Sequence, residues 1–189
     1  MKHAEITPYS EQDYLSAEQR GEVRHEYVAG QVFAMAGAGK AHNLIALNIA
    51  TRIRAHARGG PCRVYMADMK VRVAQQSAYY YPDVVVTCDG RDTAPESEKF
   101  YLVAPALIVE VLSPATEAID RREKLLAYRT LESLQEYVLV DQEQRQIEVY
   151  RRTQSGWSAD TLSPGDTMAL ESIRLTLSLD EVYEDTGIA

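Results

Sequence analysis

The spacing of apolar residues predicts three main helices along the chain. Apolar positions recur with helical period from Lys40 to about Arg58, where Gly59-Gly60-Pro61 stops the pattern. Ser10 to Arg20 begins with a capping-type serine and indicates a short helix. A third helix is expected from Glu117 to Leu131, and a last short one near Leu179 to Tyr183.

Other segments have the alternating or wholly apolar character of strands. His25-Glu26-Tyr27-Val28 and Gln31-Val32-Phe33-Ala34-Met35 flank Ala29-Gly30, which predicts a hairpin. Further strands and turns are expected at Arg63–Val73, Tyr80–Thr87 and Ala106–Leu112, in a hairpin of Glu136–Val140 with Gln146–Tyr150, and at a turn over Ser163–Asp166. This order predicts an α/β fold, a mixed sheet flanked by helices. With no repeat or Pro/Gly/Ser-rich linker, residues 1–189 are expected to form a single domain.

Composition and charge narrow the class of protein. The chain is 46% hydrophobic and 25% charged, enough apolar material for a core. The N-terminus lacks the apolar stretch of a secretory signal, and no apolar run approaches the ~20 residues that span a bilayer, so we expect a cytoplasmic protein. The net charge of −8 argues against coating DNA by bulk electrostatics, but not against an enzyme with cations in a cleft.

The two cysteines predict neither a zinc site nor a disulfide framework. Cys62 and Cys88 are the only ones, and they lack C-x-x-C spacing. We therefore expect buried, reduced thiols.

Glu110 is the residue that most strongly indicates chemistry. It lies within Leu107-Ile108-Val109-Glu110-Val111-Leu112, a run apolar enough for a central strand covered on both faces. A carboxylate buried there needs a cation, a hydrogen-bond network or a proton. A metal or catalytic site is favoured, and a salt bridge to an Arg or Lys of a packing helix is the structural alternative.

Asp83 and Lys124 complete the candidate set. Asp83 follows Pro82 at the start of an apolar strand, where it could end a turn. Paired with Glu110 on a neighbouring strand, it would suit an oxygen-preferring cation, Mg²⁺ or Mn²⁺. Lys124 shares a helix face with Asp120 and Tyr128. Spacing alone leaves open whether Lys124 forms a surface ion pair or acts near a metal.

These motifs together resemble the Uma-two family of restriction-endonuclease-like proteins. The matching blocks are His25–Gly30, Ala41-His42-Asn43, Tyr81–Val86, Val109–Thr116 and the later Asp120, Lys124 and Tyr128. The resemblance covers about residues 22–150. It implies a PD-(D/E)XK nuclease fold, a restriction-endonuclease-like mixed sheet flanked by helices, here with an added C-terminal β-rich segment.

The resemblance also implies roles for residues. Asp83 and Glu110 would bind Mg²⁺ or Mn²⁺ and, with Lys124, be catalytic in a metal-dependent endonuclease acting on DNA. The superfamily's lysine position is Leu112 here, and Lys124 from the following helix matches the residue thought to replace it. Glu26 and His42 match family positions as auxiliary residues, and Asp68 is an expected further carboxylate.

Partners and rival functions stay open at this stage. Cationic side chains near the cleft, Lys70, Arg72, Arg121 and Arg122, are expected to hold the DNA backbone. A homodimer is expected by analogy with nucleases that cut both strands. The alternative function is a non-catalytic nucleic-acid or protein interaction module on the same fold, and a third is hydrolysis of another phosphoester.

Overall fold

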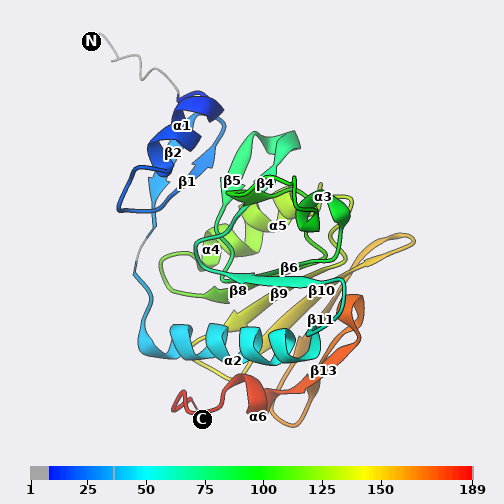
Figure 1. The fold of residues 1–189 in the computed structure, drawn as a ribbon. Coiled ribbons are helices and arrows are strands. Elements are labelled where there is room, and N and C mark those ends of the chain that lie inside the picture. Colours follow the sequence, from blue (N-terminus) through cyan, green and yellow to red (C-terminus); the bar gives the residue numbers. More distant parts are fainter. Residues whose placement is uncertain (1–8, 36, 189) are drawn as a thin grey trace.

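The strands of this protein form three sheets (Figure 1). The structure is a computed structural model that describes residues 9–35 and 37–188. The six-stranded sheet has the order β11 (Gly156–Leu162), β10 (Ile147–Thr153), β9 (Glu136–Asp141), β8 (Leu107–Leu112), β6 (Val84–Thr87) and β3 (Arg63–Met66). The five-stranded sheet has the order β2 (Gln31–Ala34), β1 (His25–Val28), β5 (Ala78–Tyr80), β4 (Lys70–Val73) and β7 (Tyr101–Leu102). The third pairs β12 (Thr167–Leu170) with β13 (Leu175–Ser178).

Helices lie on both sides of the six-stranded sheet. The helices of the described residues are α1 (Glu11–Glu18), α2 (Lys40–His56), α3 (Gly90–Thr93), α4 (Glu117–Ile119), α5 (Leu125–Tyr128) and α6 (Leu179–Val182), of which α1 packs on the five-stranded sheet instead. Between α4 and α5 lies a π-helical turn, η2 (Asp120–Lys124), and the short 3₁₀ turns are η1 (Ala74–Gln76) and η3 (Glu171–Ile173). β8 and β9 pair in parallel, which requires the crossover that α4, η2 and α5 provide. The predicted α/β fold with a mixed sheet is confirmed.

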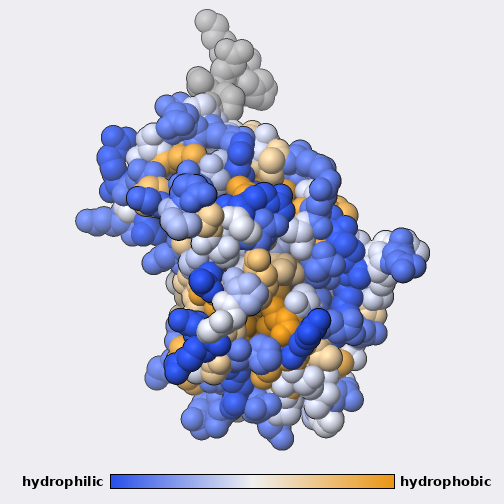
Figure 2. All heavy atoms as spheres, turned by 45° about the vertical axis from the view of Figure 1, so that its right-hand side comes forward, coloured by the Kyte–Doolittle hydropathy of each residue, from blue (hydrophilic) through white to orange (hydrophobic). Residues whose placement is uncertain are grey.

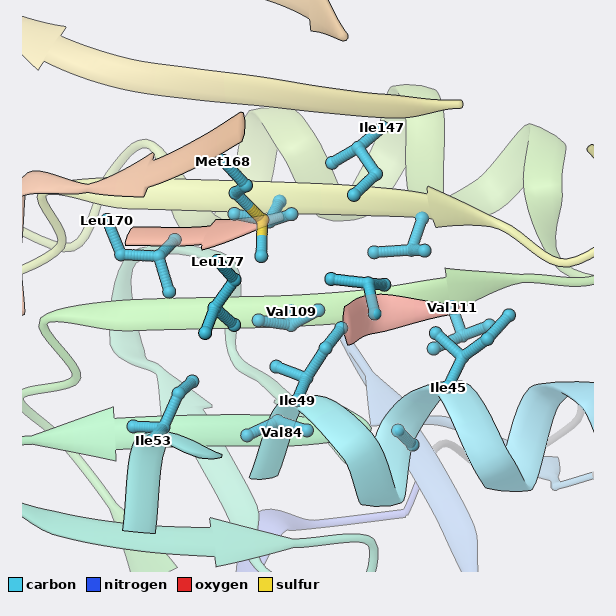
Figure 3. Packing of buried hydrophobic residues seen from close by; sticks show 14 of the residues in the cluster. Ile45, Ile49, Ile53, Val84, Val109, Val111, Ile147, Met168, Leu170 and Leu177 are labelled. Atoms are coloured by element: carbon cyan, nitrogen blue, oxygen red, sulfur yellow. The ribbon is translucent and has the colours of Figure 1, made fainter. Parts of the chain in front are cut away.

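Helix α2 packs on one face of the six-stranded sheet and forms the larger core (Figure 3). Ile45, Ile49 and Ile53 recur every four residues on the helix face that points at the sheet, where they contact strand residues such as Val109. Full burial of each such side chain contributes about 1.5–3 kcal/mol. This face of α2 therefore fixes the helix, and with it His42 in its first turn.

The C-terminal segment closes the far side of α2. Leu179, Val182 and Tyr183 join the same core. Asn48 Nδ2 donates to the backbone oxygen of Val182 at 3.1 Å. Residues that are more than a hundred positions apart are thus packed side by side.

The opposite face of the sheet is covered by η2 and α5. Tyr80, Leu112, Tyr128 and Tyr137 belong to this second buried cluster. The Tyr128 and Tyr137 ring centroids are 5.3 Å apart, an edge-on contact. Leu112 therefore packs in this apolar cluster, away from solvent.

Two predicted strands and one helix are divided in the structure. The segment 63–73 splits into β3 and β4, in different sheets, at Ala67, whose φ is 45°. The segment 80–87 splits at Tyr81-Pro82-Asp83, where proline lacks an N–H for a ladder. The predicted helix 117–131 contains the π-helical turn η2, and the segment that follows β6 contains the short helix α3.

The expectation of reduced cysteines is wrong. Cys62 and Cys88 form a disulfide. Cys62 precedes β3 and Cys88 follows β6, and the pairing of Arg63 with Thr87 sets the two cysteines opposite each other. The sequence did not predict the disulfide because a separation of 26 residues gives no indication of which strands pair.

The surface is mostly hydrophilic, with hydrophobic residues gathered in a hollow on the face shown in Figure 2. In residues 9–35 and 37–188, no helix combines the length and apolar character needed to cross a bilayer.

Candidate functional site

Asp83 and Glu110 stand opposite each other on neighbouring strands. β6 and β8 are antiparallel with Val84 opposite Val109, and this register, continued by one residue before β6, sets Asp83 opposite Glu110. Residues opposed in this way project from the same face of a sheet. The Val111 N–H donates to Asp83 Oδ2 at 2.7 Å. The Asp83 side chain is 23% exposed and that of Glu110 only 4%, so one carboxylate is open to solvent and the other is buried.

Lys124 lies at the centre of the cluster. Its Nζ is 2.9 Å from Glu26 Oε1, 3.2 Å from Glu110 Oε1 and 3.2 Å from Asp120 Oδ1. The side chain is 7% exposed. Lys124 therefore contacts Glu110, as required of a lysine that replaces the one missing at position 112. The same contact is also the salt bridge to a packing helix that the sequence left open as a structural role for Glu110.

The two auxiliary residues Glu26 and His42 both join the cluster. Glu26 on β1 accepts a hydrogen bond from the Tyr81 N–H at 3.2 Å besides its ion pair with Lys124. His42 Nε2 is 2.9 Å from Asp83 Oδ1. Its other ring nitrogen, Nδ1, is buried without a hydrogen-bond partner among the described residues.

Two further residues complete the cluster, Asp120 and Tyr128. The Tyr128 hydroxyl donates to Glu110 Oε1 at 3.1 Å. Asp120 is buried and ion-pairs with Lys124, while its Oδ1 has no hydrogen bond within the described part of the chain. Their four-residue spacing from Lys124 was the signal that pointed to them, but it did not distinguish a buried face from a surface one.

The cluster carries more negative than positive charge. Burial raises the pKa of Glu110 well above its usual range, and the nearby Asp120, Asp83 and Glu26 raise it further, against the opposing effect of Lys124. For Lys124, burial works against the charged form, yet the surrounding carboxylates hold its pKa well above the ordinary value. The ammonium is therefore charged and shared among carboxylates that outnumber it.

Two predicted residues lie away from the site. Asp68 is exposed and pairs with Arg24 at 3.2 Å, so the structure does not bring it to the carboxylate cluster. Lys70 was expected to hold a DNA backbone, but it is buried and donates to the Tyr81 hydroxyl at 3.2 Å. Burial of Lys70 excludes a contact with a DNA backbone, whereas the Arg122 side chain is exposed.

The other predicted cations are engaged within the protein. Arg72 pairs with Glu11 at 3.0 Å. Arg121 pairs with Glu117 at 2.7 Å and also with Glu148. These ion pairs reduce the positive charge available for phosphates near the cluster.

The donor set of the cluster suits a hard cation in part. Asp83 and Glu110 offer carboxylate oxygens, which Mg²⁺ and Mn²⁺ prefer. Both described contacts of Glu110 go to Oε1. Within residues 9–35 and 37–188, no group of three or more His, Cys, Asp or Glu side chains is arranged around a common metal position. The fit therefore rests on the carboxylates of the cluster, which outnumber the Lys124 ammonium.

Comparisons with known proteins show the family of the chain. A model of the Uma2 family, described as "Putative restriction endonuclease", matches residues 11–180. An uncharacterized protein of Synechocystis sp., slr1290, is 37% identical over 185 residues, covering 96% of each chain. A second uncharacterized Synechocystis protein, sll1609, is 30% identical over 140 residues, 74% of this chain and 78% of the relative.

A solved structure shares the fold. It is described as a "putative nuclease belonging to DUF820" from Anabaena variabilis, and it superposes with a TM-score of 0.78 at 20% identity. The match covers 93% of this chain and 98% of the other. At this identity the likeness shows the fold.

Proposed function

Since this chain belongs to the Uma2 family, we propose that it is an endonuclease that hydrolyses DNA phosphodiester bonds with Mg²⁺ or Mn²⁺. The observation that carries the proposal is the contact of Lys124 with Glu110, which itself stands opposite Asp83. These are the residue types that metal-dependent phosphodiester hydrolysis requires: carboxylates for the cation and a positive group near the phosphate.

Asp83 and Glu110 are the proposed metal-holding residues. When bound, the ion would lower the pKa of a water ligand and polarise a phosphoryl oxygen. Tyr128 orients Glu110 by donating to Oε1. His42 and the Val111 N–H hold the two oxygens of Asp83 in place.

Lys124 is the proposed catalytic lysine. Glu26 and Asp120 hold its ammonium beside Glu110, and its charge would offset the negative charge that builds up on phosphate during hydrolysis. The buried position limits the freedom of the side chain, so little ordering is required when a substrate arrives.

A non-catalytic binding module is the second candidate. It is favoured by one observation, that Lys124 already neutralises part of the charge of Glu110 within the protein. In that case the carboxylates form a structural network, and the net charge of −8 would select a partner other than bulk duplex DNA.

A cleavage assay with two aspartate variants tests the proposal. Wild type, Asp83→Asn and Asp68→Asn are incubated with supercoiled, linear and single-stranded DNA in Mn²⁺, Mg²⁺ or EDTA. Asp68 is the matched control because it is exposed and lies outside the cluster. Cleavage by wild type and Asp68→Asn, only with metal, is the expected result, with Asp83→Asn inactive although folded by circular dichroism.

Two outcomes would count against the proposal. Equal cleavage by Asp83→Asn would indicate a contaminating nuclease or another site. Absence of cleavage by the wild type on every substrate, with DNA binding retained, would favour the binding module.

A further inference from the structure

Phe33 stands beside the candidate site on the β1–β2 hairpin. In the antiparallel register, Phe33 is the direct partner of Glu26. Opposed residues project from the same face, with Cβ atoms about 4.5–5.5 Å apart. Because Glu26 Oε1 lies 2.9 Å from Lys124 Nζ, the phenyl ring lies at the rim of the carboxylate cluster.

The ring is left open to solvent. Phe33 is 50% exposed, and every residue of β2 is exposed. By contrast Tyr27, on the other face of the hairpin, stacks on Tyr14 with ring centroids 5.0 Å apart. Within the described residues, Phe33 forms no such aromatic pair, since the close ring pairs all join tyrosines.

The exposed apolar surface continues along the strand. The Met35 N–H donates to the Arg24 carbonyl oxygen at 2.9 Å, which extends the ladder of the hairpin. Met35 is two residues from Phe33, so its side chain shares the face of Phe33 and is also exposed. An apolar strip therefore runs beside Glu26.

The position of β2 leaves room for a ligand on this strip. β2 is an edge strand of its sheet, paired on one side only. The hairpin is fixed by the pairing of Tyr27 with Tyr79 and by the Ala29 N–H, which donates to the Ser77 oxygen at 3.0 Å. The ring is thus held on a fixed strand rather than on a loose loop.

Charge indicates what this strip would contact. The molecule carries a net charge of −8, and two cations of this region are in ion pairs, Lys124 with Glu26 and Arg24 with Asp68. Attraction for a phosphate backbone is weak under these conditions. Stacking of a base on an aromatic ring does not depend on net charge, but a duplex already stacks both faces of its bases.

We infer that Phe33 stacks on an unpaired nucleobase beside the phosphodiester held at the cluster, so that the preferred substrate is single-stranded or locally opened DNA. This inference rests on the proposed nuclease function and adds to it the class of substrate. The contact would supply affinity next to the reacting phosphate without adding positive charge.

Binding measurements with a matched phenylalanine control test the inference. Phe100 is almost equally exposed, at 48%, and directly precedes β7 at the opposite edge of the same sheet. Wild type, Phe33→Ala and Phe100→Ala are titrated by fluorescence anisotropy with a single strand, its duplex and an abasic single strand of equal length. Ca²⁺ is present, and a gel checks that the strands are uncut.

The expected result is selective. Phe33→Ala should lose at least about fivefold in affinity for the single strand, the lower end for loss of one stacked base. Its affinity for the duplex and the abasic strand should match the wild type, and Phe100→Ala should bind all three as the wild type does. In Phe33→Trp, the single strand should quench tryptophan fluorescence beyond the change in the wild type, whose sole tryptophan is Trp157.

Several results would overturn the inference. Equal single-strand affinity of Phe33→Ala and Phe100→Ala, or tight binding of the abasic strand, would exclude stacking at this ring. A change of oligomeric state in Phe33→Ala would make the strip a contact between copies. Cleavage in Mn²⁺ is measured in parallel: if the wild type cuts DNA and Phe33→Ala cuts single strands equally well, the nuclease function stands and this inference fails.

Discussion

Replacing Lys124 with methionine should strongly destabilise the protein when metal is absent. The change removes the ammonium that lies within 2.9–3.2 Å of Glu26, Glu110 and Asp120. Methionine keeps most of the side-chain volume, so the effect reports on charge rather than on a cavity. Three carboxylates would then face one another in a buried space.

The size of the loss follows from the burial. Breaking a buried ion pair by removing one partner costs about 3–5 kcal/mol. Lys124 is 7% exposed, so solvent screens little of this interaction. For a chain of this size, each kcal/mol lowers Tm by about 2–4 °C, which predicts a fall of about 6–20 °C in EDTA.

Metal should restore much of the loss if the cluster holds a cation as proposed. A ligand at a hundred times its Kd stabilises the folded state by about 2.7 kcal/mol. Without the competing ammonium, Mn²⁺ should raise the Tm of Lys124→Met more than that of the wild type. Thermal unfolding followed by circular dichroism, with EDTA or Mn²⁺, measures both effects.

Lys70→Met is the matched control, because Lys70 is the other buried lysine among the described residues and its Nζ donates to Tyr81. Mn²⁺ should not rescue this variant. The reasoning would be refuted if Lys124→Met were as stable as the wild type in EDTA. Equal rescue of both variants by Mn²⁺ would refute the metal part alone.

Three other measurements test the fold and the cluster. Burial raises the pKa of Glu110, so ionisation of its carboxyl above about pH 4.5 destabilises the folded state. In EDTA, the unfolding free energy of the wild type relative to that of Glu110→Gln should therefore fall by up to about 1.4 kcal/mol per pH unit. A difference that stays constant with pH would contradict this. Replacing Cys62 and Cys88 with serine should cost about 3.5 kcal/mol in urea unfolding, from the entropy of a 26-residue separation, and no loss would contradict the bridge. Ile49→Ala should cost about 2–5 kcal/mol and exposed Leu47→Ala under about 0.5, and similar losses would contradict the packing of α2.

The sequence predicted elements whose signals are local. The period of Ile45, Ile49 and Ile53 predicts α2 because one face of a helix repeats every three to four residues. Ser10 as a cap correctly predicted α1, and its side chain accepts from the Asp13 N–H. The division of 80–87 between two sheets depends on which strands lie nearby, and no local pattern carries that information.

The candidate site was predictable where a residue contradicts its surroundings. Glu110 stands out because a charge within an apolar strand requires a partner, and the structure supplies Lys124 and Tyr128. Asp120 could not be distinguished from a solvated helix residue by spacing alone. Lys70 was expected near the cleft as a contact for the DNA backbone, and only the tertiary structure reveals its burial and its contact with Tyr81.

The packing of α6 against α2 has a consequence for the order of folding during synthesis. Arg52 on α2 pairs with Glu181, 129 residues later, so closing this contact requires a long chain to come together. A ribosome that has released Asp83, Glu110 and Lys124 has not yet released the segment that covers α2, the helix carrying His42. The charged residues of the cluster are therefore synthesised before the core around α2 can be completed, and the site can reach its final geometry only late in translation.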